Sequence, residues 1–65
     1  MGLSQDYLNE MLKKAARYGH IEIVRLMIEH GANNFDEAIP DAARCGHINI
    51  VKLLEEAEAK TESKV

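Results

Sequence analysis

The side chains best suited to bind a metal or to react are one cysteine and the histidines near it. His20 and His47 each follow a glycine, and Cys45 stands two residues before His47. Thiolates and imidazoles bind zinc, so Cys45 and His47 could form a site with His20 or His30. A structural zinc ion usually has four ligands, and no fourth stands at a recognisable spacing. An imidazole can instead hydrogen-bond across a tight turn, which explains its repetition. No metal site is therefore predicted.

Catalytic patterns are weak in this sequence. Cys45 would need an oriented base to act as a nucleophile. His47 lies across a predicted turn from it, and Tyr18 replaces the thiol before the other Gly-His pair. The four glycines form no phosphate-binding loop. We expect neither an enzyme nor a cofactor.

Composition narrows the function further. The chain has 65 residues and a net charge of −3, and its Lys and Arg are interleaved with acids, so no nucleic acid is expected as a partner. It lacks an apolar run long enough to span a membrane and lacks a secretory signal pattern. A single cysteine suits a reducing compartment, which favours the cytoplasm. One small domain over residues 1–65, with an aliphatic core and marginal stability, is predicted.

An internal repeat organises the chain. The segment AARYGHIEIVRLMIE from Ala15 matches AARCGHINIVKLLEE from Ala42 at ten of fifteen positions, with an offset of 27 residues. Repeat one spans about 6–32 and repeat two about 33–59, followed by a polar, frayed tail over 60–65. Chance does not produce this agreement, so the chain is two copies of one unit.

Each unit is predicted to contain two helices. Apolar residues recur with helical spacing over about 6–18, and a second, more apolar helix covers about 21–30. The second unit repeats this, with its last helix over about 48–59. Asn34 and Glu37 resemble a capping box at the start of the third helix. Pro40 requires that helix either to begin later than the repeat implies or to bend. The fold class is therefore all-α, with four helices in a short α-solenoid.

These residues resemble the ankyrin repeat. Its most specific stretch is an alanine pair, two variable residues, Gly-His, an amphipathic helix and Gly-Ala. Residues 15–32 match it nearly throughout, and residues 42–47 match again. The family period is 33 residues and here it is 27, so the chain is similar to a shortened variant without the β-turn finger.

The resemblance implies a non-enzymatic protein–protein interaction module. It places the contact residues at the variable positions before Gly-His: Arg17, Tyr18, Arg44 and Cys45. The alternative is a self-assembling structural or engineered scaffold whose partner is itself. Solenoids usually need three or more units, so Leu8, Met11 and Leu12 could line an uncovered apolar face near the N-terminus. A homodimer with two-fold symmetry would cover that face.

Overall fold

The chain folds into four helices that form two successive hairpins. The computed structural model describes residues 4–62, with α1 at Gln5–Tyr18, α2 at Ile21–Glu29, α3 at Phe35–Arg44 and α4 at Ile48–Glu62. No strand occurs within these residues. The all-α class and the four expected helices are confirmed. Helix α4 extends to Glu62 and so includes the start of the segment expected to be a frayed tail, while residues 63–65 lie outside the described range.

The ends of α1 show why the first helix forms where it does. Ser4 is the N-cap, and its side chain accepts a hydrogen bond of 3.1 Å from the Tyr7 backbone N–H. This satisfies one of the donors that the first turn of a helix leaves unpaired. At the other end Gly19 takes a left-handed conformation with φ of +82°, and its N–H bonds to the carbonyl of Ala15. Such a glycine ends a helix without the steric penalty of a side chain.

Helix α3 differs in two ways from its expected form. It begins at Phe35, so Pro40 lies inside it. The alternative in which the helix begins later to avoid Pro40 is therefore wrong. Proline has no N–H, which leaves the Asp36 carbonyl without its usual helical donor. The expected capping box does not form, because the Asn34 side chain accepts no hydrogen bond from a helix N–H. Its amide nitrogen instead donates to Glu37 Oε1 at 3.3 Å and to the Asn9 carbonyl oxygen at 3.0 Å.

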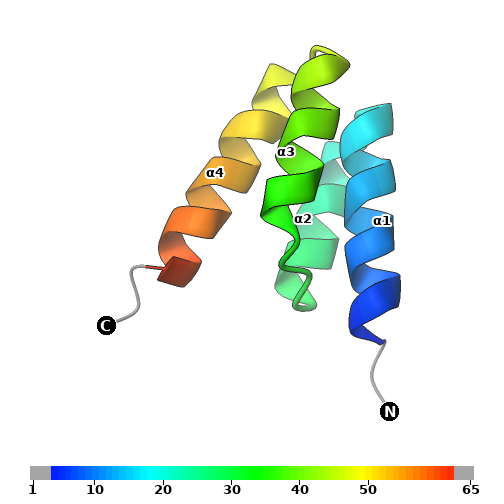
Figure 1. Cartoon of the computed structure of the whole chain (residues 1–65), viewed down its shortest axis with the longest axis vertical. Coiled ribbons are helices and arrows are strands. Elements are labelled where there is room, and N and C mark those ends of the chain that lie inside the picture. The colour runs from blue at the N-terminus through cyan, green and yellow to red at the C-terminus, as the bar shows by residue number, and fades with distance from the viewer. Residues whose placement is uncertain (1–3, 63–65) are drawn as a thin grey trace.

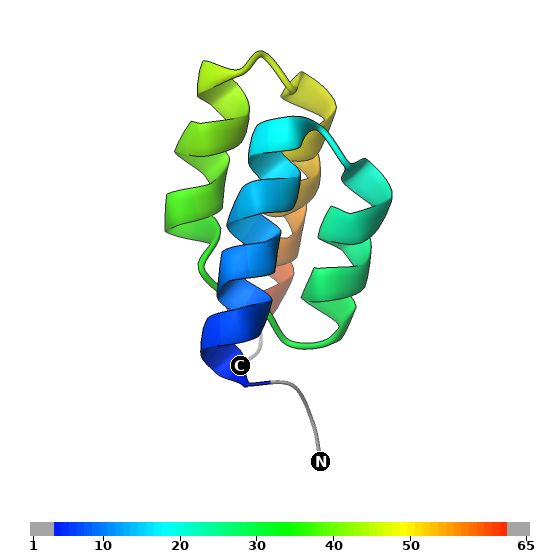
Figure 2. The ribbon, with the colours of Figure 1, turned by 90° about the vertical axis from the view of Figure 1, so that its right-hand side faces the viewer.

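The second hairpin stacks on the first. Helices α1 and α3 run side by side in the same direction, and α4 packs against α3 and also reaches α2 (Figure 1). Figure 2, which looks onto the first hairpin, shows α1 nearest the viewer with α2 beside it. The core between the helices is aliphatic apart from one phenylalanine; its members are Leu8, Leu12, Ala15, Ala16, Val24, Met27, Ala32, Phe35, Ala38, Ala42, Ile50 and Leu54.

Polar contacts fix the two hairpins at the end of the molecule where α1 starts. Asn9 is central: its Oδ1 accepts from the Asn33 N–H at 3.1 Å and from Gln5 Nε2 at 3.0 Å. Its carbonyl oxygen accepts from the Asn34 amide, while Gln5 Nε2 also reaches the Gly31 carbonyl at 3.1 Å. The loop between repeats is thus bonded to α1, which sets the register of α3 along α1.

The residues expected to line an uncovered face are mostly part of this core. Leu8 is 4% exposed and Leu12 is fully buried, because both point into the space between the helices. Met11 is half-buried and packs on the rim of the core. The expectation that Leu8 and Leu12 line an uncovered surface is therefore wrong, and its physical reason is that α1 uses them to pack against its own chain.

Candidate functional site

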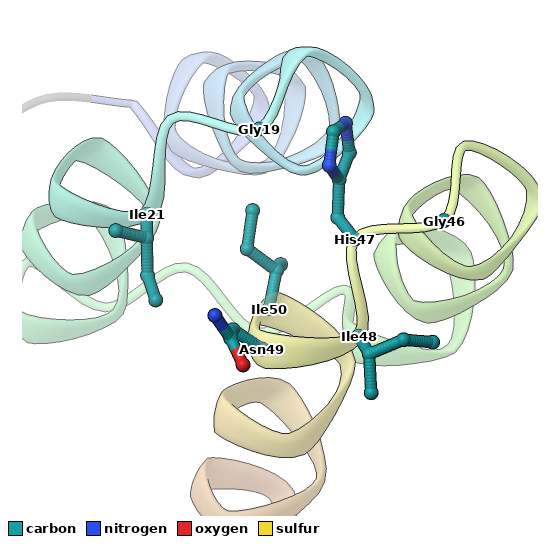
Figure 3. Close-up of a pocket in the computed structure, with 7 residues that line it drawn as sticks. All are labelled: Gly19, Ile21, Gly46, His47, Ile48, Asn49 and Ile50. Carbon is teal, nitrogen blue, oxygen red and sulfur yellow. The ribbon is translucent and has the colours of Figure 1, made fainter.

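The contact between the two inter-helix turns joins the repeats at the other end of the stack. His47 Nε2 donates to the Arg17 carbonyl oxygen at 3.2 Å, across the junction between the hairpins. The imidazole lies over Gly19, where an added Cβ would come within 2.7 Å of the ring (Figure 3). Because Gly19 has no side chain, His47 can reach the carbonyl oxygens left unpaired at the end of α1. The hydrogen bond expected from this histidine thus runs between repeats instead of within one turn.

His20 holds the same place in repeat one but has a different environment. It is exposed, its side chain does not cap α2, and its ring lies 6.5 Å from that of Tyr18. Cys45 is an exposed free thiol. Within residues 4–62 no three His, Cys, Asp or Glu side chains are grouped as metal ligands would be. The four candidate ligands, Cys45, His47, His20 and His30, are therefore not part of such a group in the described residues.

A pocket of about 310 Å³ opens beside these turns, lined by Gly19, Ile21, Gly46, His47, Ile48, Asn49 and Ile50. In Figure 3 His47 and Ile50 extend toward Gly19, while Ile48 points away from it. The His47 imidazole already donates to the Arg17 carbonyl, and Asn49 is the other polar side chain on the lining. None of the side chains that line this pocket carries a thiol, hydroxyl or carboxylate group.

A second hollow lies between the outer sides of α1 and α3, and we call it the charged groove. Its volume is about 320 Å³, and three basic and two acidic side chains line it: Glu10, Lys13, Lys14, Arg17 and Glu37. Lys14 Nζ is 3.9 Å from Glu10 Oε2, an exposed pair one helical turn apart. Exposed pairs of this kind contribute little to stability, so these side chains can exchange partners at small cost.

Arg17 connects the charged groove to the repeat junction. Its Nη2 lies 3.8 Å from Asp41 Oδ2, which is beyond hydrogen-bond distance, and its side chain remains 52% exposed. Asp41 is far less accessible, and its Oδ2 atom is buried without a hydrogen-bond partner in the described part of the chain. The Arg17 guanidinium thus lies near a mostly buried carboxylate, while about half of the arginine side chain remains accessible to solvent.

The fold gathers the four residues expected to contact a partner at one end of the molecule. Arg17 and Tyr18 close α1, Arg44 closes α3, and Cys45 follows it; all four are exposed. Because α1 and α3 are parallel neighbours, their ends meet on the same edge (Figure 1). Arg17 alone of the four lines the charged groove.

Sequence reasoning did not assign the rest of the groove to a binding site. Glu10, Lys13, Lys14 and Arg17 follow one another at helical spacing on the outside of α1, and that periodicity could have revealed them. Glu37 belongs to α3 and joins them across the repeat junction, which no local pattern shows.

Fold and surface together define a class of protein, a short α-solenoid of two stacked helix hairpins with a groove along its first helices. A family-level sequence model, described as ankyrin repeats in three copies, matches residues 3–64. The chain belongs to the ankyrin repeat family. No curated protein and no solved structure matches it.

Membership of this family has a general functional meaning. Ankyrin repeats are typically non-enzymatic modules that bind other proteins. The family model contains three copies, whereas residues 4–62 form two helix hairpins. None of the helices in that range has the length and hydropathy needed to cross a bilayer.

Proposed function

We propose that this chain binds another protein through the charged groove and the exposed helix ends next to it. The observation that carries the proposal is the placement of Arg17, which lines the groove, keeps half of its side chain exposed and lies 3.8 Å from the carboxylate of Asp41. Arginine and tyrosine are enriched at protein interfaces, and Tyr18 beside Arg17 is 64% exposed.

The charges around the groove indicate the chemistry of the bound segment. The whole chain is acidic, but basic side chains outnumber acidic ones in the groove, and Arg44 extends this bias at the same edge. A partner segment with carboxylates facing Arg17, Lys13 and Arg44 would meet complementary charge. Such complementarity mainly increases the association rate and the specificity, and its effect falls with salt.

The test compares matched arginine variants. Proteins captured from a cell extract by the wild-type chain are identified by mass spectrometry, and the purified candidate is then titrated directly. Arg17→Ala combined with Arg44→Ala should weaken binding by about tenfold or more, as expected for truncated interface arginines. The control is Arg25→Ala, an exposed arginine on α2 away from the groove.

Circular dichroism should show the same helicity for all these variants, because the substituted side chains are exposed. Equal binding by the double variant and the wild type would remove Arg17 and Arg44 from the site. A similar loss in Arg25→Ala would show that general charge, and not the groove, controls binding.

We infer a second candidate function, self-association through the side of the first hairpin that no other helix of residues 4–62 covers. The observation in its favour is that two tyrosines are exposed on α1, Tyr7 at 50% and Tyr18 at 64%. A short solenoid of two hairpins gains a larger buried core when this side is covered. Sedimentation equilibrium over a range of concentrations tests the idea, and a mass of 7.3 kDa at every concentration would reject it.

A further inference from the structure

One row of side chains on α1 is turned mostly away from α3, although its Lys14 also lines the charged groove and its Met11 also packs on the rim of the core. The row consists of Tyr7, Met11, Lys14 and Tyr18, and we call it the tyrosine stripe. Each residue turns an α-helix by about 100°, so these four residues share one side of the helix. The fully buried Leu12 and Ala16 lie on other sides of the helix, where the chain packs on itself. Figure 2 looks toward the uncovered side, with α1 nearest the viewer.

The second repeat shows that this side of a hairpin is a packing surface. The residues of the second repeat that correspond to the stripe, 27 positions later, are Asn34, Ala38, Asp41 and Cys45, of which the first and last flank α3. Asn34 is 9% exposed and Ala38 is fully buried, Asp41 is partly buried and Cys45 is exposed, and α3 packs against α1. In repeat one the same positions carry exposed tyrosines and an exposed lysine, with Met11 half-buried. Tyrosine and methionine are among the residues enriched in protein interfaces.

The spacing of the stripe makes it complementary to itself. Its residues are separated by four, three and four positions, so the spacing is the same in both directions and a tyrosine stands at each end. A two-fold axis between Met11 and Lys14 would place Tyr7 of each copy against Tyr18 of the other, so this contact would form twice. Met11 would then face the aliphatic part of Lys14 of the second copy. Isologous two-fold contacts are the commonest form of self-association, and offset or edge-to-face aromatic pairs favour them.

Charge decides between this arrangement and a continuous head-to-tail stack. At the junction between the two repeats Asp41 lies opposite Arg17, at 3.8 Å. In a head-to-tail contact, the first repeat of one copy would pack on the second repeat of another. Lys14, at the position equivalent to Asp41, would then approach Arg44, at the position equivalent to Arg17. Two cations would then face each other, which disfavours that contact. In the two-fold arrangement the Lys14 ammonium stays at the rim, beside Glu10 of its own chain at 3.9 Å.

We propose that the tyrosine stripe is a self-association surface on which a second copy of this chain docks antiparallel, with Tyr7 of each copy against Tyr18 of the other. The inference rests on the second candidate function and deepens it by naming the contact. It assigns the contact between copies to the exposed Tyr7 and Tyr18 and not to Leu8 and Leu12, which the fold buries.

Charge-exchange variants test the pairing directly. Tyr7→Lys and Tyr18→Glu should each weaken self-association by about tenfold, because every dimer of one variant loses both aromatic pairs. An equimolar mixture of the two should recover association, since a mixed dimer joins the introduced lysine to the introduced glutamate and keeps one Tyr7–Tyr18 pair. Masses are measured by sedimentation equilibrium under reducing conditions, because the exposed Cys45 thiol could otherwise link two chains.

The control is Ile48→Glu, which places a carboxylate on an exposed apolar residue of the other repeat, 57% accessible. It should leave the two-fold dimer intact, whereas a head-to-tail stack would be weakened by it. A wild-type chain that stays monomeric at every concentration would overturn both the pairing and self-association. A dimer that both tyrosine variants preserve, or a mixture that associates no better than its components, would overturn the pairing alone.

Cysteine linkage gives a second readout that tolerates a variant with reduced stability. In a Cys45→Ser background, oxidation of Tyr7→Cys mixed with Tyr18→Cys should give disulfide-linked heterodimers faster than either variant links to itself. Equal rates for the mixture and the separate variants would contradict the antiparallel contact.

Discussion

Replacing Gly19 with alanine should lower the free energy of unfolding for two reasons, backbone strain in the turn and loss of a contact between the repeats. Gly19 has φ of +82°, and a Cβ built on it would lie 2.7 Å from His47 Cε1. The substitution therefore strains the backbone and also displaces the imidazole that donates to the Arg17 carbonyl.

The magnitude has two parts. An L-residue in the left-handed region costs about 1–2 kcal/mol. The lost hydrogen bond adds about 0.5–1.5 kcal/mol. We expect Gly19→Ala to lower the free energy of unfolding by about 1.5–3.5 kcal/mol in total. For a domain of this size that is a large share of the stability.

Gly46 supplies the matched control within the same chain. Its φ is +81°, but nothing lies within 4 Å of the Cβ that alanine would add. Gly46→Ala should therefore show the backbone cost alone, about 1–2 kcal/mol. The difference between the two variants measures the contact between His47 and the turn of repeat one.

Urea unfolding followed by far-UV circular dichroism gives the free energies, with an osmolyte added if the variants are too unstable. A double-mutant cycle adds a stricter criterion: in a His47→Ala background, Gly19→Ala should cost no more than Gly46→Ala. If Gly19→Ala and Gly46→Ala are equally destabilising in the natural background, the junction contact does not contribute and the reasoning is refuted.

Two further substitutions test the fold. Pro40→Ala should raise the stability by at most about 3 kcal/mol, since alanine restores a helix N–H while adding freedom to the unfolded chain; an unchanged or lower urea midpoint would contradict the placement of Pro40 inside α3. Leu12→Ala should lower the free energy of unfolding by about 2–5 kcal/mol, because its side chain is fully buried. The comparison is Leu26→Ala, 46% exposed, for which a much smaller loss is expected; similar losses at both positions would mean that Leu12 is not in the core.

Much of the fold could be predicted because it depends on local and repeated patterns. The ends of α1, the glycine turn at Gly19 and the start of α4 at Ile48 were all predictable from helical periodicity and turn residues. Pro40 was harder, since its position allowed two outcomes. Packing of α3 between α1 and α4 offsets the missing hydrogen bond, and that support is tertiary.

The candidate surfaces were less predictable than the helices. The variable residues before each Gly-His were expected to contact a partner protein. The fold places them at an exposed edge, and whether they bind a partner stays a prediction. Leu8 and Leu12 were expected on an uncovered face, because helical spacing shows which residues share a side but not which neighbour covers it. Tyr7 and Lys14 were not singled out, since their significance depends on α3 lying on the other side of α1.

The sequence by itself determined the repeat, its two-helix unit, the turn glycines and the ankyrin character, because each follows from the order of residues along the chain. The tertiary structure decided which side of α1 is covered, that His47 bonds to the preceding repeat, and that Glu37 joins the charges of α1 in one groove. These features depend on distances between residues far apart in the chain. Such distances are set by how the second hairpin packs on the first, and periodicity within a helix does not contain them.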